Sequence, residues 1–243
     1  MDDLKRVNRK FLGTIFGFVV YILGVTYLIW ESYLLFSKSS YAYALTFAIL
    51  LITLFVISLF RAKLDAIINM SYLVKIRKNA GEPLVIKRLK SKEFLHTYLI
   101  NNNYIMFAKD VSYVMYYKVE KDHIKKMLRN YILEIVVYIN DSENEFYLEI
   151  VDEQIQKLQE MLRKEKKKVE KLLITQFKAV DELNEQTKES IKEIVFIRSQ
   201  SGIISTINVG LHYESNLAVL LYSDTYSPSL YYAYQVAEIK KMI

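Results

Sequence analysis

Cysteine is absent from this 243-residue chain, and histidine, proline and glycine are scarce. Without cysteine the chain forms no disulfide and offers no thiolate for metal binding or nucleophilic catalysis. A chain without disulfides suits a reducing compartment, so we expect its large domain to be cytosolic. The three histidines (His96, His123 and His212) are too scattered to form a spaced ligand signature. The sequence therefore predicts no metal site and no cofactor.

Charged side chains are missing from two stretches of twenty residues, Phe11–Trp30 and Tyr41–Phe60. At about 1.5 Å per residue, each forms a helix of about 30 Å, the thickness of the hydrocarbon core of a bilayer. We therefore predict a hairpin of two transmembrane helices, 11–30 and 41–60, with a short external loop at 31–40. Two alternatives are a pair of buried core helices and a cleaved signal peptide whose small-residue site is Ala42–Ala44.

The basic residues predict the orientation of this hairpin. Four of them lie in residues 1–10, Lys38 alone lies between the two stretches, and eight lie in residues 61–90. Basic residues are enriched in the segments that remain in the cytosol. We therefore expect a multi-pass protein of the cell membrane with both termini in the cytosol, beginning with a basic cytosolic N-terminus at 1–10.

Small residues recur at helical spacing in both apolar stretches. Gly13, Gly17 and Gly24 share one stripe of the first helix, and Ala44 and Ala48 form a pair on the second. Small residues let helix backbones approach closely in lipid. The stripe therefore predicts either packing of the two helices within one chain or a homodimer formed through the transmembrane helices.

The net charge of +6 raises the question of nucleic-acid binding. The excess positive charge lies beside the apolar stretches, because residues 91–243 hold 20 basic and 22 acidic side chains. This distribution indicates attraction to anionic lipid at the bilayer surface. The lipid bilayer is thus an expected partner, and nucleic acid is not.

A basic juxtamembrane helix and linker are predicted for residues 61–90. Residues 61–78 continue the second apolar stretch with apolar residues at helical spacing, and they lie either on the inner leaflet or on the following domain. Asn79–Pro83 reads as a break. The remaining residues, 91–243, are enough for one domain with a good core.

Alternating and helical patterns in residues 91–243 predict a mixed α/β domain, of the α+β kind, in which helices cover one mixed sheet. The predicted helices are 91–100, 120–130, 152–168, 181–192 and 229–243. The predicted strands are 104–108, 111–119, 131–139, 172–180, 194–198, 203–210 and 217–222. The strands 131–139 and 172–180 are nearly continuous apolar runs, so we expect them at the centre of the sheet.

Gln176-Phe177-Lys178 lies inside a predicted strand. It resembles one motif of the restriction-endonuclease-like nucleases, in which a strand carries an acid or amide, an apolar residue and a lysine. The resemblance implies a Mg²⁺ ligand at Asp141 or Asp152 and a role for Lys178 in the attack of water. An alternating surface strand explains the same three residues. The catalytic candidates are thus Gln176, Lys178 and Asp152.

Two polar loops bound the predicted strand 217–222 and supply candidate binding residues. They contain His212, Asp224 and Tyr226, and the second leads into a tyrosine-rich helix with Tyr231 and Tyr232. Loops on a rigid sheet often carry binding residues, and tyrosines make large, rigid contacts. The alternative is a helix-capping loop, with Ser227 or Ser229 near the N-cap and core tyrosines behind it.

The sequence favours a non-enzymatic function. We expect a membrane-anchored protein whose cytosolic domain recruits or regulates another protein, because the sequence shows no catalytic constellation and the apolar stretches contain no Asp, Glu, Lys, Arg or His. The first alternative is a membrane-anchored Mg²⁺-dependent hydrolase or nuclease that uses Lys178. The second is a structural subunit of a membrane complex, held through the glycine stripe.

Overall fold

The computed structural model describes residues 2–36, 41–124, 127–140, 145–199 and 202–243 of the chain. It divides into two compact units, residues 1–74 and 75–243. The first is a pair of long helices, and the second is a mixed sheet with helices on both faces. The structure confirms the predicted order of two long apolar helices followed by a mixed sheet-and-helix domain.

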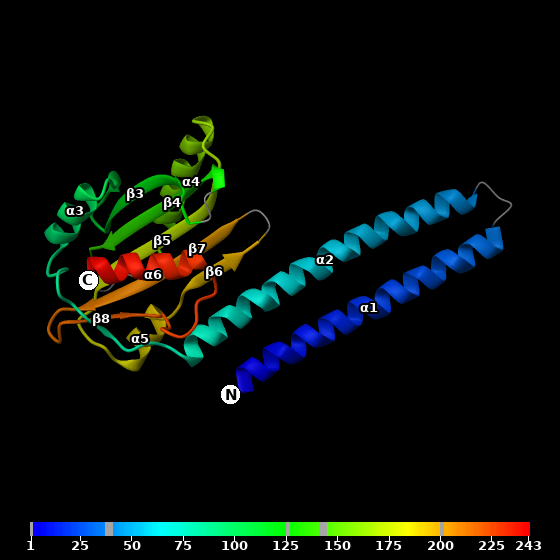
Figure 1. Ribbon diagram of the computed structural model, residues 1–243, viewed down its shortest axis with the longest axis horizontal. Coiled ribbons are helices and arrows are strands. Elements are labelled where there is room, and N and C mark those ends of the chain that lie inside the picture. The colour runs from blue at the N-terminus through cyan, green and yellow to red at the C-terminus, as the bar shows by residue number, and fades with distance from the viewer. Residues whose placement is uncertain (1, 37–40, 125–126, 141–144, 200–201) are drawn as a thin grey trace. The chain divides into compact units, whose positions relative to one another are not determined.

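Two helices, α1 (Asp2–Phe36) and α2 (Tyr41–Lys78), make up the first unit and run antiparallel (Figure 1). The ring of Phe18 on α1 contacts that of Phe60 on α2, with centroids 5.3 Å apart. Both helices extend past the apolar stretches: α1 includes most of the basic N-terminus, and α2 includes residues 61–78 without a break.

Both helices are long and apolar enough to cross a membrane. Only 6% of the most apolar window of each is buried inside the structure. Core helices of a globular protein would bury most of such a window, because apolar burial drives their packing. The large apolar side chains of the pair therefore remain available to an apolar environment.

The sheet of the second unit has the strand order β1-β8-β7-β5-β4-β3-β2, with β6 also paired to β7. Neighbouring strands are antiparallel except at β4–β5 and β5–β7, which are parallel. The strands are β1 (Leu84–Val85), β2 (Ile105–Lys109), β3 (Tyr113–Asp122), β4 (Met127–Ile139), β5 (Val169–Ala179), β6 (Val195–Arg198), β7 (Ile203–His212) and β8 (Leu217–Leu220). As predicted, the apolar runs on β4 and β5 occupy the centre.

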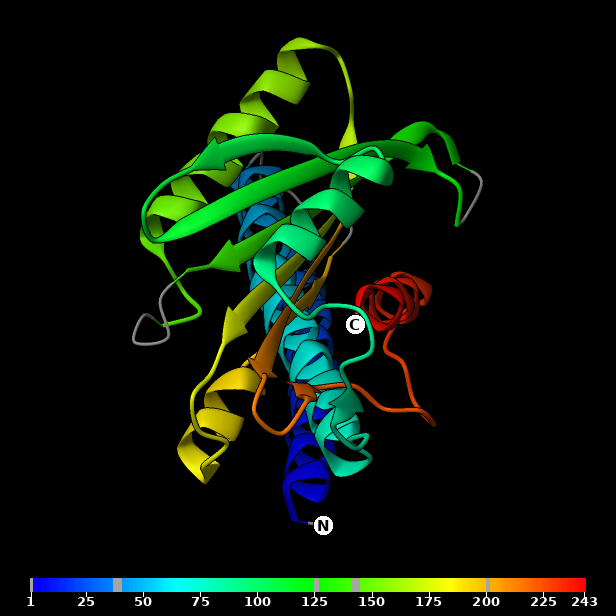
Figure 2. The ribbon, with the colours of Figure 1, turned by 90° about the vertical axis from the view of Figure 1, so that its left-hand side faces the viewer.

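Helices cover both faces of the sheet (Figure 2). One face carries α4 (Glu149–Lys164) and α5 (Glu185–Ile191), and we call it the α4 face. The opposite face carries α6 (Leu230–Met242) and α3 (Lys92–Asn101), and we call it the α6 face. Side chains alternate between these faces along each strand. Leu172 and Ile174 of β5 belong to the core cluster of the α4 face.

Side chains cap the N-termini of α3, α5 and α6, whereas α4 has no side-chain cap among the described residues. Ser91, Asn184 and Ser229 each accept a hydrogen bond from a backbone N–H of the first turn, at 3.3, 2.8 and 3.0 Å. Such caps satisfy donors that have no partner within the helix. Ser229 is one of the two serines predicted near the N-cap of the C-terminal helix.

The helix predicted at residues 120–130 is wrong. β3 continues to Asp122 and β4 begins at Met127, so the two strands form a long antiparallel pair. Glu120, the first residue of the predicted helix, lies on the strand instead and forms a 2.6 Å ion pair with Lys118, two residues earlier on the same face. Buried Asp122 accepts a hydrogen bond from Tyr231 of α6, a long-range contact that sequence periodicity does not reveal.

Candidate functional site

A cavity of about 1250 Å³ hollows the α4 face of the second unit. It is lined by residues of α4, α5, β5 and β7, and we call it the α4–α5 groove. Its floor consists of alternate residues of the two strands, which point to the same face. These are Leu172, Ile174, Gln176 and Lys178 from β5 and Ile204, Thr206 and Asn208 from β7.

The walls of the groove come from three segments. The first is the start of α4 and the residues before it, the second is the connection from β5 through α5, and the third is the approach to β6. Ile155 and Gln156 contribute from α4, and Val195 contributes from β6. Val195 and Ile204 are 46% and 39% exposed, so apolar surface remains uncovered at this site.

Asn208 is the most unusual polar group of the groove. Its side chain is 4% exposed, and its Nδ2 donates to the carbonyl oxygens of Glu193 (2.8 Å) and Ser190 (3.4 Å). Within the described residues, its Oδ1 is the one buried side-chain polar atom without a hydrogen-bond partner. A buried acceptor without a donor costs about 1–3 kcal/mol. A donor from a bound group would offset that cost.

The charge of the groove is strongly acidic. Among the described residues that line it, Lys178 is the single basic side chain. The carboxylates are Glu145, Asp152, Asp181, Glu182, Glu189 and Glu193. One of them, Glu189, is paired with Lys192 at 3.2 Å. Carboxylates gathered at one concave surface attract cations and repel phosphate groups.

The groove brings together the three catalytic candidates of the sequence, Gln176, Lys178 and Asp152. The Lys178 ammonium lies 5.2 Å from the centroid of the Phe146 ring. Asp141, the other candidate for the first metal ligand, lies outside the described residues. The described part of the chain contains no group of three or more His, Asp or Glu side chains placed to hold a metal ion.

The five binding candidates of the sequence do not form one site. His212 Nδ1 contacts Ser215 Oγ at 2.6 Å, and its Nε2 lies 3.0 Å from the Asp181 carbonyl oxygen. Asp224 forms a 3.0 Å ion pair with Lys240 on α6. The ring of Tyr226 lies 5.7 Å from the Lys75 ammonium.

Tyr231 and Tyr232 are core residues at 0% and 1% exposure. The Tyr231 hydroxyl donates to Asp122, and the Tyr232 hydroxyl donates to the Leu221 carbonyl oxygen at 2.6 Å. Burial raises the pKa of both phenols above the ordinary value, so both remain protonated donors. The two tyrosines hold α6 on the sheet.

A second polar network fixes α6 to the same face. Glu134 on β4 is 6% exposed and accepts hydrogen bonds from Tyr104 (2.7 Å) and from Tyr234 of α6 (2.9 Å). Burial raises the pKa of this carboxyl group above the ordinary value, while the two hydroxyls oppose the shift. The α6 face is therefore closed by internal contacts, whereas the α4 face retains the groove.

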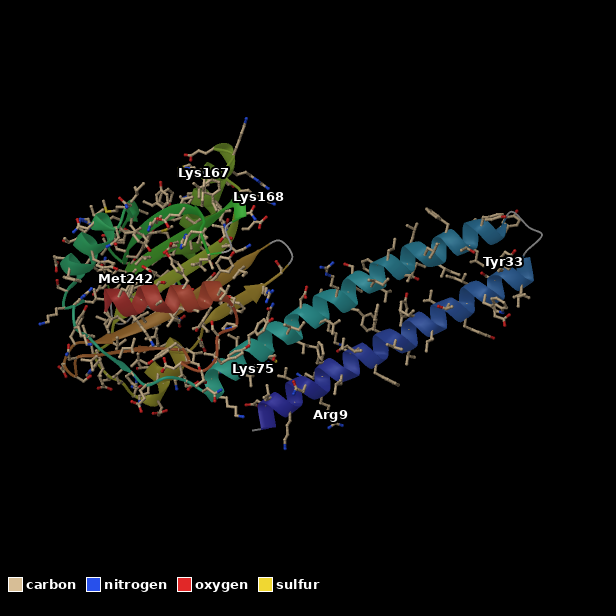
Figure 3. All side chains as sticks on the ribbon, in the orientation of Figure 1. Arg9, Tyr33, Lys75, Lys167, Lys168 and Met242 are labelled. Atoms are coloured by element: carbon tan, nitrogen blue, oxygen red, sulfur yellow. The ribbon has the colours of Figure 1, made fainter. Side chains whose placement is uncertain are left out.

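The turn between α4 and β5 carries the dense basic run of the domain (Figure 3). Lys167 pairs with Glu165 at 2.8 Å and Lys168 pairs with Glu170 at 2.6 Å. Each pair offsets one positive charge of the run with a carboxylate, as expected for a solvated helix end. We therefore place no anion site here.

The small residues of the two long helices lie largely outside their contact. A Cβ added at Gly17 would lie 3.9 Å from the Phe60 ring, but Cβ atoms at Gly13 and Gly24 would have no neighbour within 4 Å among the described residues. Ala44 and Ala48 are exposed. Gly17 is thus the member of the glycine stripe that faces α2.

Sequence reasoning identified Gln176, Lys178 and Asp152 but not Asn208, Thr206 or the surrounding acids. The signal in the sequence that could have indicated Thr206 and Asn208 is the placement of polar residues at alternate positions of an otherwise apolar strand. Comparison of the chain with protein-family models, with curated proteins and with solved structures finds no match. The assignment of function rests on the geometry of the chain itself.

Proposed function

We propose that this chain is a membrane-anchored protein whose α/β domain recruits another protein through the α4–α5 groove. The helices α1 and α2 are the anchor. The observation that carries the recruiting role is the groove itself, a large concavity that combines exposed apolar side chains with a carboxylate rim.

The polar groups of α1 and α2 support the membrane anchor. The hydroxyls of Thr14, Thr26 and Thr53 donate to backbone carbonyls four residues earlier, at 2.9, 2.8 and 2.7 Å. In the absence of water, each hydroxyl needs such an internal partner. Together with the uncovered apolar surface, these contacts suit both helices to a hydrocarbon environment.

The distribution of charge and aromatic residues supports the orientation. Arg9 lies near the basic N-terminal end of α1 and Tyr33 near its other end (Figure 3). Basic residues favour the cytosolic side, and aromatic rings favour the membrane interface. We infer that both chain termini and the sheet domain are cytosolic, and that the connection between α1 and α2 is external.

The size of the groove favours a protein segment as its occupant. Pockets that enclose a small molecule have volumes of roughly 300–1,000 Å³. The groove is larger, at about 1250 Å³, and its floor includes four alternate residues of β5, from Leu172 to Lys178. A strand rises about 3.3 Å per residue, so this floor has the length of a short peptide.

The test is photo-crosslinking of the full-length chain in its native membrane. A crosslinking amino acid replaces Val195 or Ile204 in the groove, and a matched control replaces Val111 in the turn between β2 and β3, which is 91% exposed. We expect both groove positions to capture the same protein in equal stoichiometry and the control position not to capture it. The Ile204→Asp variant should release this protein from the purified complex.

Capture from Val111 alone, or capture that Ile204→Asp leaves unchanged, would contradict the recruiting role. The native fold of the variant is checked by circular dichroism in the near ultraviolet. Ile204 tolerates a polar replacement because more than a third of its side chain is exposed.

A membrane-anchored hydrolase is the second candidate, because Gln176, Lys178 and Asp152 line one cavity. It predicts that the full-length chain cleaves DNA or RNA when Mg²⁺ is added. Lys178→Ala should abolish that cleavage, whereas Lys171→Ala, on the same strand but the opposite face, should not. The six carboxylates weigh against this candidate, since they repel the phosphate backbone.

A further inference from the structure

We propose that the segment recognised by the α4–α5 groove is a basic amphipathic helix of the partner protein. This inference rests on the proposed recruiting function and names the chemistry of the partner. Three features of the groove carry it: its carboxylate rim, its apolar floor and the unpaired acceptor of Asn208.

The rim selects positive charge. Asp181, Glu182 and Glu193 are exposed, and they stand on one side of the groove, in the segments that flank α5. Glu145 and Asp152 stand on the other side, before and within the first turn of α4. Carboxylates on both sides of a concavity complement cationic side chains that flank a central apolar stripe. Lysine or arginine on the two polar flanks of a helix meets this condition.

The floor selects an apolar stripe. The apolar side chains exposed in the groove are Val195 of β6, Ile204 of β7 and Tyr147, whereas Leu172, Ile174 and Ile155 beside them are buried. On this face α4 covers one part of the sheet and the seven-residue α5 covers little of the rest. An α/β sheet is stable when helices pack on both faces, so a helix from a partner would complete this layer. Helices bind such grooves through apolar residues at i, i+3, i+4 and i+7.

Asn208 adds a specific requirement to this stripe. Its Nδ2 donates to the carbonyl oxygens of Ser190 and Glu193, and its Oδ1 is buried without a hydrogen-bond partner among the described residues. Gln176 lies directly opposite it in the strand register and offers a second amide. The bound helix therefore carries one hydrogen-bond donor, such as glutamine or lysine, within its apolar stripe. A buried acceptor that stays unpaired in the complex would lower the affinity.

The test measures peptide binding to the full-length chain in nanodiscs of phosphatidylcholine. The first labelled peptide is a helix of about four turns with leucine at the stripe positions, one glutamine within the stripe, and lysine on both flanks. A second has leucine in place of the glutamine, and a third has glutamate in place of every lysine. Fluorescence anisotropy reports binding, and empty nanodiscs report any binding to lipid.

We expect saturable binding of the first peptide, about threefold to tenfold weaker binding of the second, and none of the third. The double variant Glu182→Lys with Glu193→Lys should weaken binding of the first peptide about tenfold. Glu153→Lys is the matched control, because Glu153 is an exposed acid of α4 outside the groove. This control should bind like the natural sequence.

Equal binding of the lysine and glutamate peptides, or equal effects of the groove and control variants, would overturn the inference. Different results would contradict the recruiting function itself. If photo-crosslinking from Val195 and Ile204 captures a partner while the basic peptide does not bind, the groove recruits a segment of other chemistry. If the peptide binds but no partner is captured from those positions, the recruiting function is wrong.

Discussion

Gln176 on β5 and Asn208 on β7 lie directly opposite each other in the parallel register of the sheet, and both line the α4–α5 groove. Both side chains are polar, yet each is less than 10% exposed and lies in a strand that is otherwise largely apolar. Asn208 also ties β7 to the end of α5 through two backbone carbonyls. The pair therefore links the floor of the groove to one of its walls.

Asn208→Ala should destabilise the sheet domain. The change leaves two carbonyl oxygens, of Ser190 and Glu193, without this donor, but it also removes the one unpaired acceptor, Oδ1, of the described residues. At about 1–3 kcal/mol for each unpaired group, a net loss of about 1–3 kcal/mol in free energy of unfolding remains. Chemical denaturation of the full chain in detergent micelles, followed by circular dichroism in the near ultraviolet, measures it. Gln156→Ala, at an exposed groove residue of α4, should stay within about 0.5 kcal/mol. Equal effects of the two variants would contradict the structural role of Asn208.

Glu134 should make the stability of the domain depend on pH. Burial raises the folded-state pKa of Glu134 above its ordinary value, so protonation favours the folded state. This contribution is fully present below the unfolded pKa of about 4.3 and is lost as the pH rises through the folded pKa. The free energy of unfolding, measured by chemical denaturation at a series of pH values, should therefore fall less steeply with rising pH in Glu134→Gln than in the natural sequence. The exposed control Glu153→Gln should keep the slope, and a slope unchanged in both variants would contradict the assignment.

Most of the fold could be predicted from the sequence where one pattern dominates a segment. The nearly continuous apolar runs of β4 and β5 predict buried central strands, and the apolar stripe of α4 repeats with the period of a helix. The prediction is wrong at residues 120–130, where the charged side chains are typical of the surface of a helix. There the pairing of β3 with β4 and the contact of Asp122 with Tyr231 decide the structure.

The groove could not be predicted from the sequence as a site. Gln176 and Asn208 are 32 positions apart, and only the parallel pairing of β5 with β7 places them side by side. The six carboxylates of the groove are spread over residues 145–193 of the sequence. Their common concavity depends on how α4 and α5 are spaced on the sheet, which follows from tertiary packing and not from local periodicity.

Gly202 should tolerate a side chain less well than Gly210. A Cβ at Gly202 would lie 2.2 Å from the Glu170 carbonyl oxygen, a backbone atom that cannot move without disrupting the sheet. A Cβ at Gly210 would lie 2.3 Å from Cδ1 of Ile191, the end of a flexible side chain. Overpacking costs about 1–3 kcal/mol in free energy of unfolding. Gly202→Ala should lose an amount at or above the upper end of this range, and Gly210→Ala should lose less. Adding Ile191→Val, which removes Cδ1, should recover part of the loss in Gly210→Ala and none of that in Gly202→Ala.

The proposed orientation in the membrane predicts which positions react with an impermeant maleimide on intact cells. The chain has no cysteine, so single-cysteine variants carry no background and the unsubstituted chain is the control. Lys38 lies outside the described residues, and Tyr33, which is 64% exposed, serves instead for the outer side. Tyr33→Cys should react on intact cells, whereas Asn79→Cys should react only after permeabilisation, since basic segments stay in the cytosol. The opposite pattern would reverse the orientation, and reaction of both positions on intact cells would contradict a hairpin with a cytosolic domain.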